Sequence, residues 1–545
     1  MEKPFIRRQF LSIPHLPTFL LFIGYICYWL ELYFVKRNSA TTSFLATGLF
    51  FCFSVFLIIR QKNNILKTFK WCVREFRGQG AFLKIIIFFA GIIGSGIILN
   101  VFLALCLPPH LPQEFDSLNY HLTIPRQHLI LGSFSHIGWS SADLFPMPIQ
   151  FALAPYWFLR EVPGKLIHIF FTFGLLAVSL NIVRKLSKNN FLSLAVIFAA
   201  VLGSHNIGIQ MPILMLDIVM AYLFIAGVDS FLQKNFFLSA IEFSFFVWSK
   251  SFYLPQMIVV TCAILIAVYF LKKIQIKKIS FSFQDTAYDS LINRNSFKKL
   301  SLCMILAGIF IGGPFVFKSL YYAGTPLFPF YPGIVSLPWI DKVSGHWQSI
   351  LSSSKMHFAT KDAYGTGRSL WEFIKQLWII AVPEKNAVNR YDYPLGLPYL
   401  LFLGPFLYFT AVSFLRKKIP ILSLFVIVFW VSWWLGSQQA RFLYIPLLLI
   451  FILVSSALKA PPRVFLTCLV IALLFNLIAI YRAHSADFLK RPMQVMRQKD
   501  KDLLEMNKAY GKVLEKKEVI LDYYDAAYAV FPVKVSCDND YWVLK

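Results

Sequence analysis

Residues 82–107 read FLKIIIFFAGIIGSGIILNVFLALCL, a continuous apolar run with one charged residue, Lys84. A helix rises about 1.5 Å per residue, so a run of this length crosses the roughly 30 Å hydrocarbon core of a bilayer. Runs of ~18 to 25 apolar residues recur along the chain. Of its 545 residues, 57% are hydrophobic and 15% are charged, whereas a soluble domain carries about 25% charged residues. The composition predicts an all-α polytopic membrane protein.

Hydropathy predicts thirteen transmembrane helices, at residues 17–34, 43–59, 82–107, 165–183, 191–209, 212–232, 236–252, 254–271, 300–317, 395–415, 420–436, 442–458 and 464–481. With the N-terminus in the cytoplasm, the basic connections 60–80 and 272–299 lie inside, as the positive-inside bias of membrane proteins requires. The same topology places the loops 108–164 and 318–394 on the outer side of the membrane. Residues 1–481 then form one transmembrane domain.

Segments outside these spans also show structural patterns. Apolar residues at helical spacing predict a helix over 117–131 and a second helix, lying along the membrane interface, over 147–159. An amphipathic stretch covers 371–380. The C-terminal segment 482–545 predicts a charged helix followed by strands at 519–524 and 529–536. We therefore expect a small exported α/β tail.

The formal net charge of +26 does not indicate a nucleic-acid partner. Many basic residues fall in short connections between spans, where they orient the helices in the membrane. The eight cysteines lie mostly in or beside apolar runs and show no C-x-x-C spacing. This distribution argues against a disulfide framework or a zinc site.

The first outer loop holds a polar cluster that reads EFDSLNYHL from Glu114 onward. In an extended segment the side chains of Glu114 and Asp116 face the same way. Paired carboxylates bind a divalent cation, or one acts as a general base while the other tunes it. The alternative is an ordinary solvated loop. The nearby Tyr120, His121 and Arg126 favour a site.

Four cationic residues are placed to meet an anion at the outer side. Arg126 and Arg441 carry the guanidinium fork that matches phosphate oxygens and stays charged. Lys250 and Lys318 lie near the outer ends of their spans. The alternative for Arg441, Lys250 and Lys318 is an interface anchor whose charged head reaches the water.

Asp217 lies about one helical turn inside the run 212–232. A carboxylate there is costly unless it is paired or hydrated, so it is a functional candidate. The alternative is a structural hydrogen bond to a neighbouring helix. If the protein binds a divalent cation, Glu114, Asp116 and Asp217 are the expected ligands, and no other cofactor is predicted. The histidines lack the spacing of a zinc site.

An aromatic turn, YYAGTPLFPF at residues 321–330, follows a later span. Its prolines and glycine restrict the backbone, and its aromatic rings suit either the headgroup level of the membrane or stacking on a sugar.

Together these features resemble the membrane-integral GT-C class of glycosyltransferases, which includes the protein mannosyltransferase and aminoarabinose transferase families. The resemblance rests on EFD and YHL in an early outer loop, on Asp217 at the start of a later span, on GTPLFP at 324–329, and on QQAR at 438–441 before a late span. Two features depart from the pattern: two extra spans precede the acidic loop, and Thr325 stands where asparagine is common.

The resemblance implies an inverting hexosyl or pentosyl transfer from a polyprenyl-phosphate sugar donor on the extracytoplasmic face of the cell membrane. Asp116 would deprotonate the acceptor hydroxyl, and Glu114 or Asp217 would assist it or hold a metal. Arg126 or Arg441 would stabilise the departing phosphate. The candidate substrate-binding residues are Tyr120, His121, Arg126, Asp217, Lys250, Lys318 and Arg441. The resemblance leaves open the sugar, the acceptor, metal dependence and the oligomeric state.

Two other classes stay open. The many spans and Asp217 also suit a lipid or sugar transporter or flippase, although the sequence shows no convincing internal repeat of the kind common in transporters. A purely structural membrane protein would tolerate alanine throughout the acidic loop.

Overall fold

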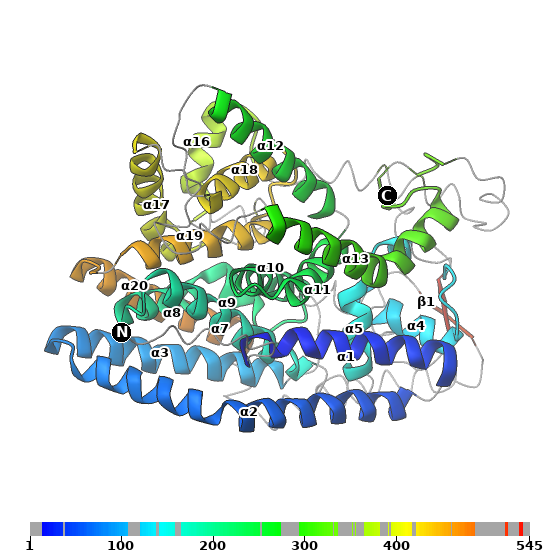
Figure 1. The fold of residues 1–545 in the computed structure, drawn as a ribbon. Helices are drawn as coiled ribbons and strands as arrows, with labels where there is room; N and C mark the ends of the chain where they lie inside the picture. The colour runs from blue at the N-terminus through cyan, green and yellow to red at the C-terminus, as the bar shows by residue number, and fades with distance from the viewer. Residues whose placement is uncertain are drawn as a thin grey trace.

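The computed structural model describes residues 13–35, 39–106, 120–137, 141–157, 165–250, 253–273, 294–330, 332–335, 351, 355, 365–381, 391, 394–416, 421–458, 460–485, 518–521 and 534–537. The described chain is a bundle of α-helices (Figure 1). The helices are α1 (Leu16–Leu30), α2 (Ser39–Arg77), α3 (Ala81–Leu105), α4 (Thr123–Leu131), α5 (Pro148–Trp157), α7 (His168–Leu186), α8 (Phe191–Gly203), α9 (His205–Gln210), α10 (Leu216–Leu232), α11 (Phe236–Trp248), α12 (Tyr253–Lys273), α13 (Arg294–Ala323), α16 (Leu370–Ile379), α17 (Leu397–Leu415), α18 (Ile421–Leu435), α19 (Tyr444–Ala457) and α20 (Arg463–Ile480).

Short 3-10 or π turns extend or connect several of these helices. They are η1 (Ile13–His15), η2 (Glu31–Val35), η4 (Ser141–Leu144), η7 (Ala440–Leu443) and η8 (Tyr481–Ser485). In Figure 1, α1, α2, α3 and α13 run lengthwise, and α4 and α5 gather at one end of the bundle.

Each of the thirteen predicted apolar segments contains a helix. Among the described residues, eight helices are long and apolar enough to cross a membrane by length and composition, or nine if α11 and α12 form one bent span. The prediction of an all-α polytopic membrane protein is confirmed at this level. Thirteen separate crossings remain a prediction.

Burial separates a central pair of helices from a lipid-facing layer. In α10 every residue except Phe231 is buried, and in α19 residues 444–456 are all buried. A helix that is apolar on all sides belongs in a core. The outer helices instead expose large apolar side chains, such as Phe51 of α2 (66%) and Ile309 of α13 (66%). Apolar surface on this scale is rare in soluble proteins and fits lipid contact.

Two tight turns join helices at the end of the bundle opposite α4 and α5. Lys188 and Asn189 connect α7 to α8, and Lys234 connects α10 to α11; all three residues have positive φ. The side chains of Asn190 and Asn235 then accept a backbone N–H in the first turn of α8 and α11. Such capping satisfies donors that the helix leaves unpaired. These turns make α7 and α8, and α10 and α11, antiparallel neighbours.

Helix α2 differs from the sequence-based expectation. A span over 43–59 followed by a basic connection over 60–80 is predicted, but one helix of 39 residues runs to Arg77. The chain contains no proline between Ser39 and Arg77, so the backbone has no reason to leave the helix before Gly78. The basic residues of this segment are therefore carried on a helix.

Helix α5 lies within the segment 147–159 for which a helix is predicted. Its residues Phe151, Ala152 and Tyr156 are buried against α1. Gly24 of α1 permits this contact, because a Cβ atom there would overlap the carbonyl oxygen of Ala152. Tyr156 donates a hydrogen bond of 2.8 Å to the carbonyl oxygen of Leu20. The position of α5 along the membrane interface stays a prediction.

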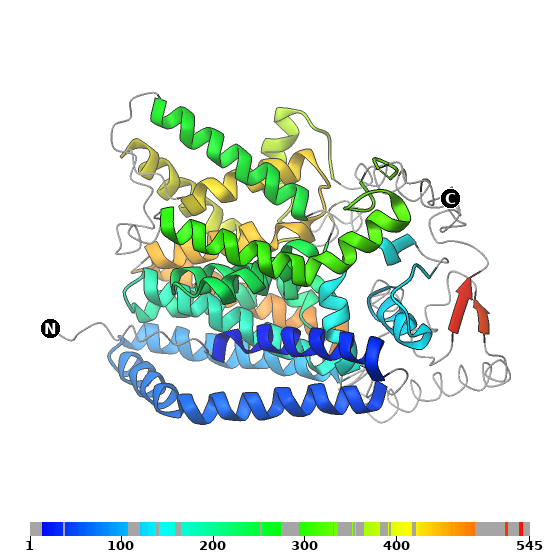
Figure 2. The ribbon, with the colours of Figure 1, turned by 45° about the vertical axis from the view of Figure 1, so that its right-hand side comes forward.

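The C-terminal segment contributes two short strands, β1 (Glu518–Leu521) and β2 (Lys534–Cys537). They pair in parallel with Glu518 opposite Lys534, at the same end of the molecule as α4 (Figure 2). The predicted charged helix of the tail lies outside the described residues. An exported α/β tail therefore stays a prediction.

Candidate functional site

Asp217 and Lys250 form an ion pair at one end of the central helices. Lys250 Nζ donates to Asp217 Oδ1 over 2.6 Å. Asp217 lies in the first turn of α10, where the helix dipole favours a negative charge, and Lys250 follows the end of α11. The side chain of Asp217 is 1% exposed and that of Lys250 is 20% exposed. The carboxylate therefore has a compensating charge in a place where an unpaired one is very costly.

Arg441 adds a second cation beside this pair. It lies in η7, and its Nε donates to Gln439 Oε1 over 2.8 Å. Lys250 Nζ and Arg441 Cζ lie 5.2 Å and 5.6 Å from the centroid of the Phe442 ring. A ring face attracts cations by about 0.5–2 kcal/mol. Phe442 therefore holds both positive groups in one region.

His121 completes the group from a distant part of the chain. Its ring is buried, lies 4.2 Å from the Tyr120 ring, and its Nδ1 is 3.2 Å from Gln150 Nε2. Burial, followed by the positive charge of Lys250, holds the pKa of His121 well below its usual range. His121 is therefore a neutral imidazole.

The described part of this group contains two cations, Lys250 and Arg441, and one anion, Asp217. The neutral His121 adds no charge. Glu114 and Asp116, the predicted catalytic residues, lie outside the described residues. Their position relative to this group stays a prediction.

Lys318 lies in a different cluster, which we call the outer-loop cluster: His128, His136, Asp143 and Lys318. Lys318 Nζ lies 2.5 Å from Asp143 Oδ1 and 2.9 Å from His128 Nε2, with its side chain 3% exposed. Its ammonium group also lies over the Phe134 ring, 4.5 Å from the centroid. These contacts join the C-terminal part of α13 to η4 and α4.

Asp143 is the acceptor at the centre of the outer-loop cluster. It accepts from His136 Nδ1 over 3.0 Å and from the N–H of Ile137 over 2.9 Å. Burial alone would raise the pKa of Asp143, but the charge of Lys318 and hydrogen bonds from His128 and His136 hold it well below its usual range. Burial and Lys318 lower the pKa of His128. The cluster is thus a lysine–aspartate pair beside His128, whose Nδ1 donates to the carbonyl oxygen of Ser133 over 2.8 Å.

The aromatic turn packs against the outer-loop cluster. Phe328 is fully buried beside Leu144 and Ala323, and its ring stacks on Phe145 at 5.5 Å. The Thr325 hydroxyl donates to the carbonyl oxygen of Phe330 over 2.6 Å. Phe328 therefore belongs to the packed interior, while Tyr321 is 37% exposed.

The structure thus divides the predicted site residues. It brings together Tyr120, His121, Asp217, Lys250 and Arg441 from four separated segments. It places Lys318 in the outer-loop cluster. Arg126 is half-buried in α4.

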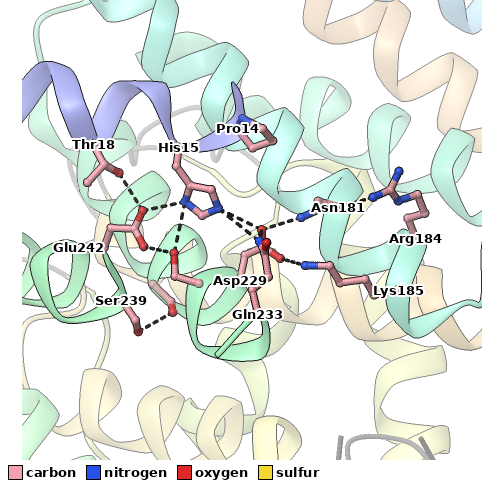
Figure 3. Close-up of polar contacts among 12 residues, drawn as sticks. Pro14, His15, Thr18, Asn181, Arg184, Lys185, Asp229, Gln233, Ser239 and Glu242 are labelled. Carbon is pink, nitrogen blue, oxygen red and sulfur yellow. Dashed lines mark hydrogen bonds and ion pairs between the residues drawn. The ribbon is translucent and has the colours of Figure 1, made fainter. Parts of the chain in front are cut away.

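The sequence did not single out the partners of Lys318 in the outer-loop cluster, nor a second group of buried polar residues. Nothing local marks Asp143 or His128, because their partner Lys318 is 175 or more residues away. At the opposite end of the helices, His15, Lys185, Asp229 and Glu242 form a buried network (Figure 3). A signal for this network was present: Asp229 and Glu242 are acids inside apolar runs, which require partners.

No metal site is formed by the part of the chain that the structure describes, where no three His, Cys, Asp or Glu side chains are grouped to hold an ion. Asp217 faces a lysine. A cation held with Glu114 and Asp116 stays a prediction.

Comparison with family models, with curated proteins and with solved structures gives no match for the chain.

Proposed function

We propose that this chain is an integral membrane glycosyltransferase of the GT-C type, which moves a sugar from a polyprenyl-phosphate donor to an acceptor on the extracytoplasmic side of the cell envelope. The observation that supports this best is the meeting of Lys250 and Arg441 at the Phe442 ring, next to Asp217 and a neutral His121. Two cations held together at the ends of apolar helices suit a lipid-linked phosphate, whose tail stays in the membrane while its anion needs cations.

In the proposed reaction, the acceptor hydroxyl oxygen attacks the anomeric carbon and its proton passes to the carboxylate of Asp116. The bond from that carbon to the phosphate oxygen breaks, and polyprenyl phosphate leaves as an anion. Lys250 and Arg441 stabilise the growing negative charge, because cations held in place beforehand lower the barrier most. Asp217 orients Lys250 through its 2.6 Å contact. Neutral His121 offers a hydrogen bond without adding charge.

The test uses the full-length protein in proteoliposomes with a panel of polyprenyl-phosphate hexoses and pentoses labelled in the sugar. Wild-type protein is expected to form labelled acceptor and free polyprenyl phosphate. The Asp116→Asn variant should lose this activity while it still inserts in the membrane. Asp285→Asn, the same change in the predicted inner connection, serves as control. Full activity of Asp116→Asn would remove this residue from the mechanism.

A second function is favoured by one observation. Helices α11 and α12 meet at an angle of 117°, and Lys250 lies in this break. Broken helices that carry binding residues occur in many transporters, so a lipid or sugar flippase is the competing proposal. The same vesicles separate the two: movement of labelled donor across the membrane without a covalent product supports the flippase.

A further inference from the structure

The buried network around His15 lies outside the proposed site, and we call it the inner network because it lies at the predicted inner ends of the helices. It joins η1 and α1 to α7, α10 and α11 (Figure 3). His15, Asp229 and Glu242 are each at most 2% exposed. It also contains the residues Thr18, Asn181, Lys185, Ser230 and Gln233.

His15 lies between two carboxyl groups. Its Nδ1 is 2.8 Å from Glu242 Oε1, and its Nε2 is 3.2 Å from Asp229 Oδ2. A neutral imidazole has one N–H and one lone pair, whereas ionised carboxylates only accept. With both acids ionised, these two contacts are both hydrogen bonds only if the ring donates from both nitrogens. The amide nitrogen of Gln233 also lies near Nε2, but at 3.5 Å it is farther than the 3.2 Å of Asp229 Oδ2. The alternative is a neutral ring that accepts from a protonated carboxyl group.

Both arrangements contain the same number of protons. In the first the extra proton is on His15, and in the second it is on Asp229 or Glu242. Either way the three groups hold one proton more than two carboxylates and a neutral imidazole would. The proton count does not depend on which atom carries it.

The remaining charges also require this proton. Lys185 Nζ donates to Asp229 Oδ1 over 2.6 Å and offsets one negative charge. Arg184 donates to the amide oxygen of Asn181, not to a carboxylate. Glu242 receives hydrogen bonds from Thr18 and Ser230, which are uncharged. Without the proton, a fully buried Glu242 would keep an uncompensated charge, which is strongly unfavourable.

The other polar groups that face the network supply no positive charge that could take the place of this proton. Asp229 also accepts from Asn181 and Gln233, over 2.6 Å and 2.7 Å. The hydroxyl of Tyr222 lies 2.8 Å from Thr18 Oγ1 and 3.3 Å from the carbonyl oxygen of Pro14. These contacts satisfy the carboxylate oxygens and carry no charge.

We propose that His15, Asp229 and Glu242 form a proton-binding site. Its bound proton stabilises the packing of η1 and the start of α1 against α7, α10 and α11, because it completes the hydrogen bonds between them and balances their charge. Chains of Asp, Glu and His inside membrane proteins are typical proton-binding groups. The site does not depend on glycosyl transfer, because it shares no residue with the proposed active site.

The experiment observes the His15 ring directly. Full-length protein with nitrogen-labelled histidine is reconstituted in lipid, and its spectrum at pH 7.5 is compared with that of His15→Gln. The difference isolates one imidazole, and we expect the signature of an imidazolium. Infrared difference spectra of wild type against Glu242→Gln and Asp229→Asn report a protonated carboxyl group. An imidazolium or a protonated carboxyl group supports the site.

A second variant tests the reason for the proton. Glu242→Gln keeps the size of the side chain and removes its charge, so His15 is expected to become neutral at pH 7.5. Glu372→Gln, a change at the surface-exposed helix α16, should leave the His15 signal unchanged. A neutral His15 facing two ionised carboxylates in the wild-type protein would overturn the proposal, and so would an imidazolium that persists in Glu242→Gln.

Discussion

Lys250 Nζ lies 2.6 Å from Asp217 Oδ1, although 33 residues separate the two in the chain. The antiparallel turn at Lys234 makes this possible, because it returns α11 along α10 and sets the end of one helix beside the start of the other. The pair therefore depends on the local backbone at the far end of the same hairpin. Helix packing and site chemistry are linked through this one contact.

Breaking the pair should destabilise the protein. Asp217→Asn leaves Lys250 with less compensation, and we expect a loss of about 2–3 kcal/mol, below the 3–5 kcal/mol seen for fully buried pairs because Lys250 is partly hydrated. The double variant Asp217→Asn with Lys250→Met should recover part of the loss. Unfolding of the purified protein in detergent measures both. Equal losses in the single and double variants would contradict a direct pairing.

Arg441→Lys should reduce sugar transfer if the proposed function is correct. Lysine keeps the charge but loses the planar fork that binds two phosphate oxygens at once, so we expect kcat/KM for the polyprenyl-phosphate donor to fall at least about tenfold, a cost of about 1.4 kcal/mol. The control is Arg463→Lys, an exposed arginine over the Phe82 ring. Unchanged transfer kinetics in Arg441→Lys would argue against phosphate recognition by this residue.

The outer-loop cluster should make stability depend on pH. The pKa values of His128 and Asp143 are lower in the folded protein than their usual values. As pH falls, the unfolded chain therefore binds more protons than the folded protein, and the free energy of unfolding decreases. The contribution of His128 to the free energy of unfolding is full above about pH 6.5 and is lost below it. The contribution of Asp143 is lost below about pH 4. Between pH 7 and pH 5, His128→Gln should flatten the fall in stability by up to about 1.4 kcal/mol per pH unit. Thermal unfolding at a series of pH values measures the stability of the wild-type protein and of His128→Gln. If stability falls with pH equally in the two proteins, His128 does not have this role.

Gly24 should tolerate no side chain. A Cβ atom at this position would approach the carbonyl oxygen of Ala152, whereas at Gly48 of α2 nothing lies within 4 Å of it. We expect Gly24→Ala to cost about 1–3 kcal/mol through overpacking, and Gly48→Ala to be neutral or stabilising by up to about 1 kcal/mol. Thermal unfolding in detergent compares the two. A similar effect of both substitutions would show that α1 and α5 adjust easily.

The predicted topology can be tested by chemical labelling. Single cysteines at Gln113 and Ser280, introduced into a cysteine-free protein, probe the acidic loop and the basic connection. A membrane-impermeant thiol reagent applied to intact cells should label Gln113→Cys but not Ser280→Cys. After the membrane is opened, both should react. Labelling of only Ser280→Cys in intact cells would place Asp116 in the cytoplasm and exclude an extracytoplasmic transfer.

The apolar runs predicted the helices well because each run must be buried or face lipid. They did not predict where α2 ends, because its basic residues favour a helix as much as a connection. They also did not predict that α5 packs on α1, since an apolar face fits a protein neighbour as well as lipid. This contact depends on Gly24, in another part of the chain.

For the site, residue type and position identified Asp217, Lys250, Arg441 and His121 as candidates, and the structure brings them together. What the sequence lacks is information on pairing. In the sequence Lys318 looked equivalent to Lys250. In the structure it pairs with Asp143, which lies in no recognisable sequence motif. Pairings across more than a hundred residues depend on how the whole bundle closes.

Helix α10 carries an acid in its first turn, Asp217, and another in its last, Asp229. The twelve residue steps from Asp217 to Asp229 correspond to about 18 Å of helix, and the helix is enclosed by neighbours over this length. Sliding it by one turn would separate both acids from their lysines at once. The ion pairs at the two ends of α10 are therefore coupled: a shift of α10 along its axis must exchange the partners of both acids in a single event.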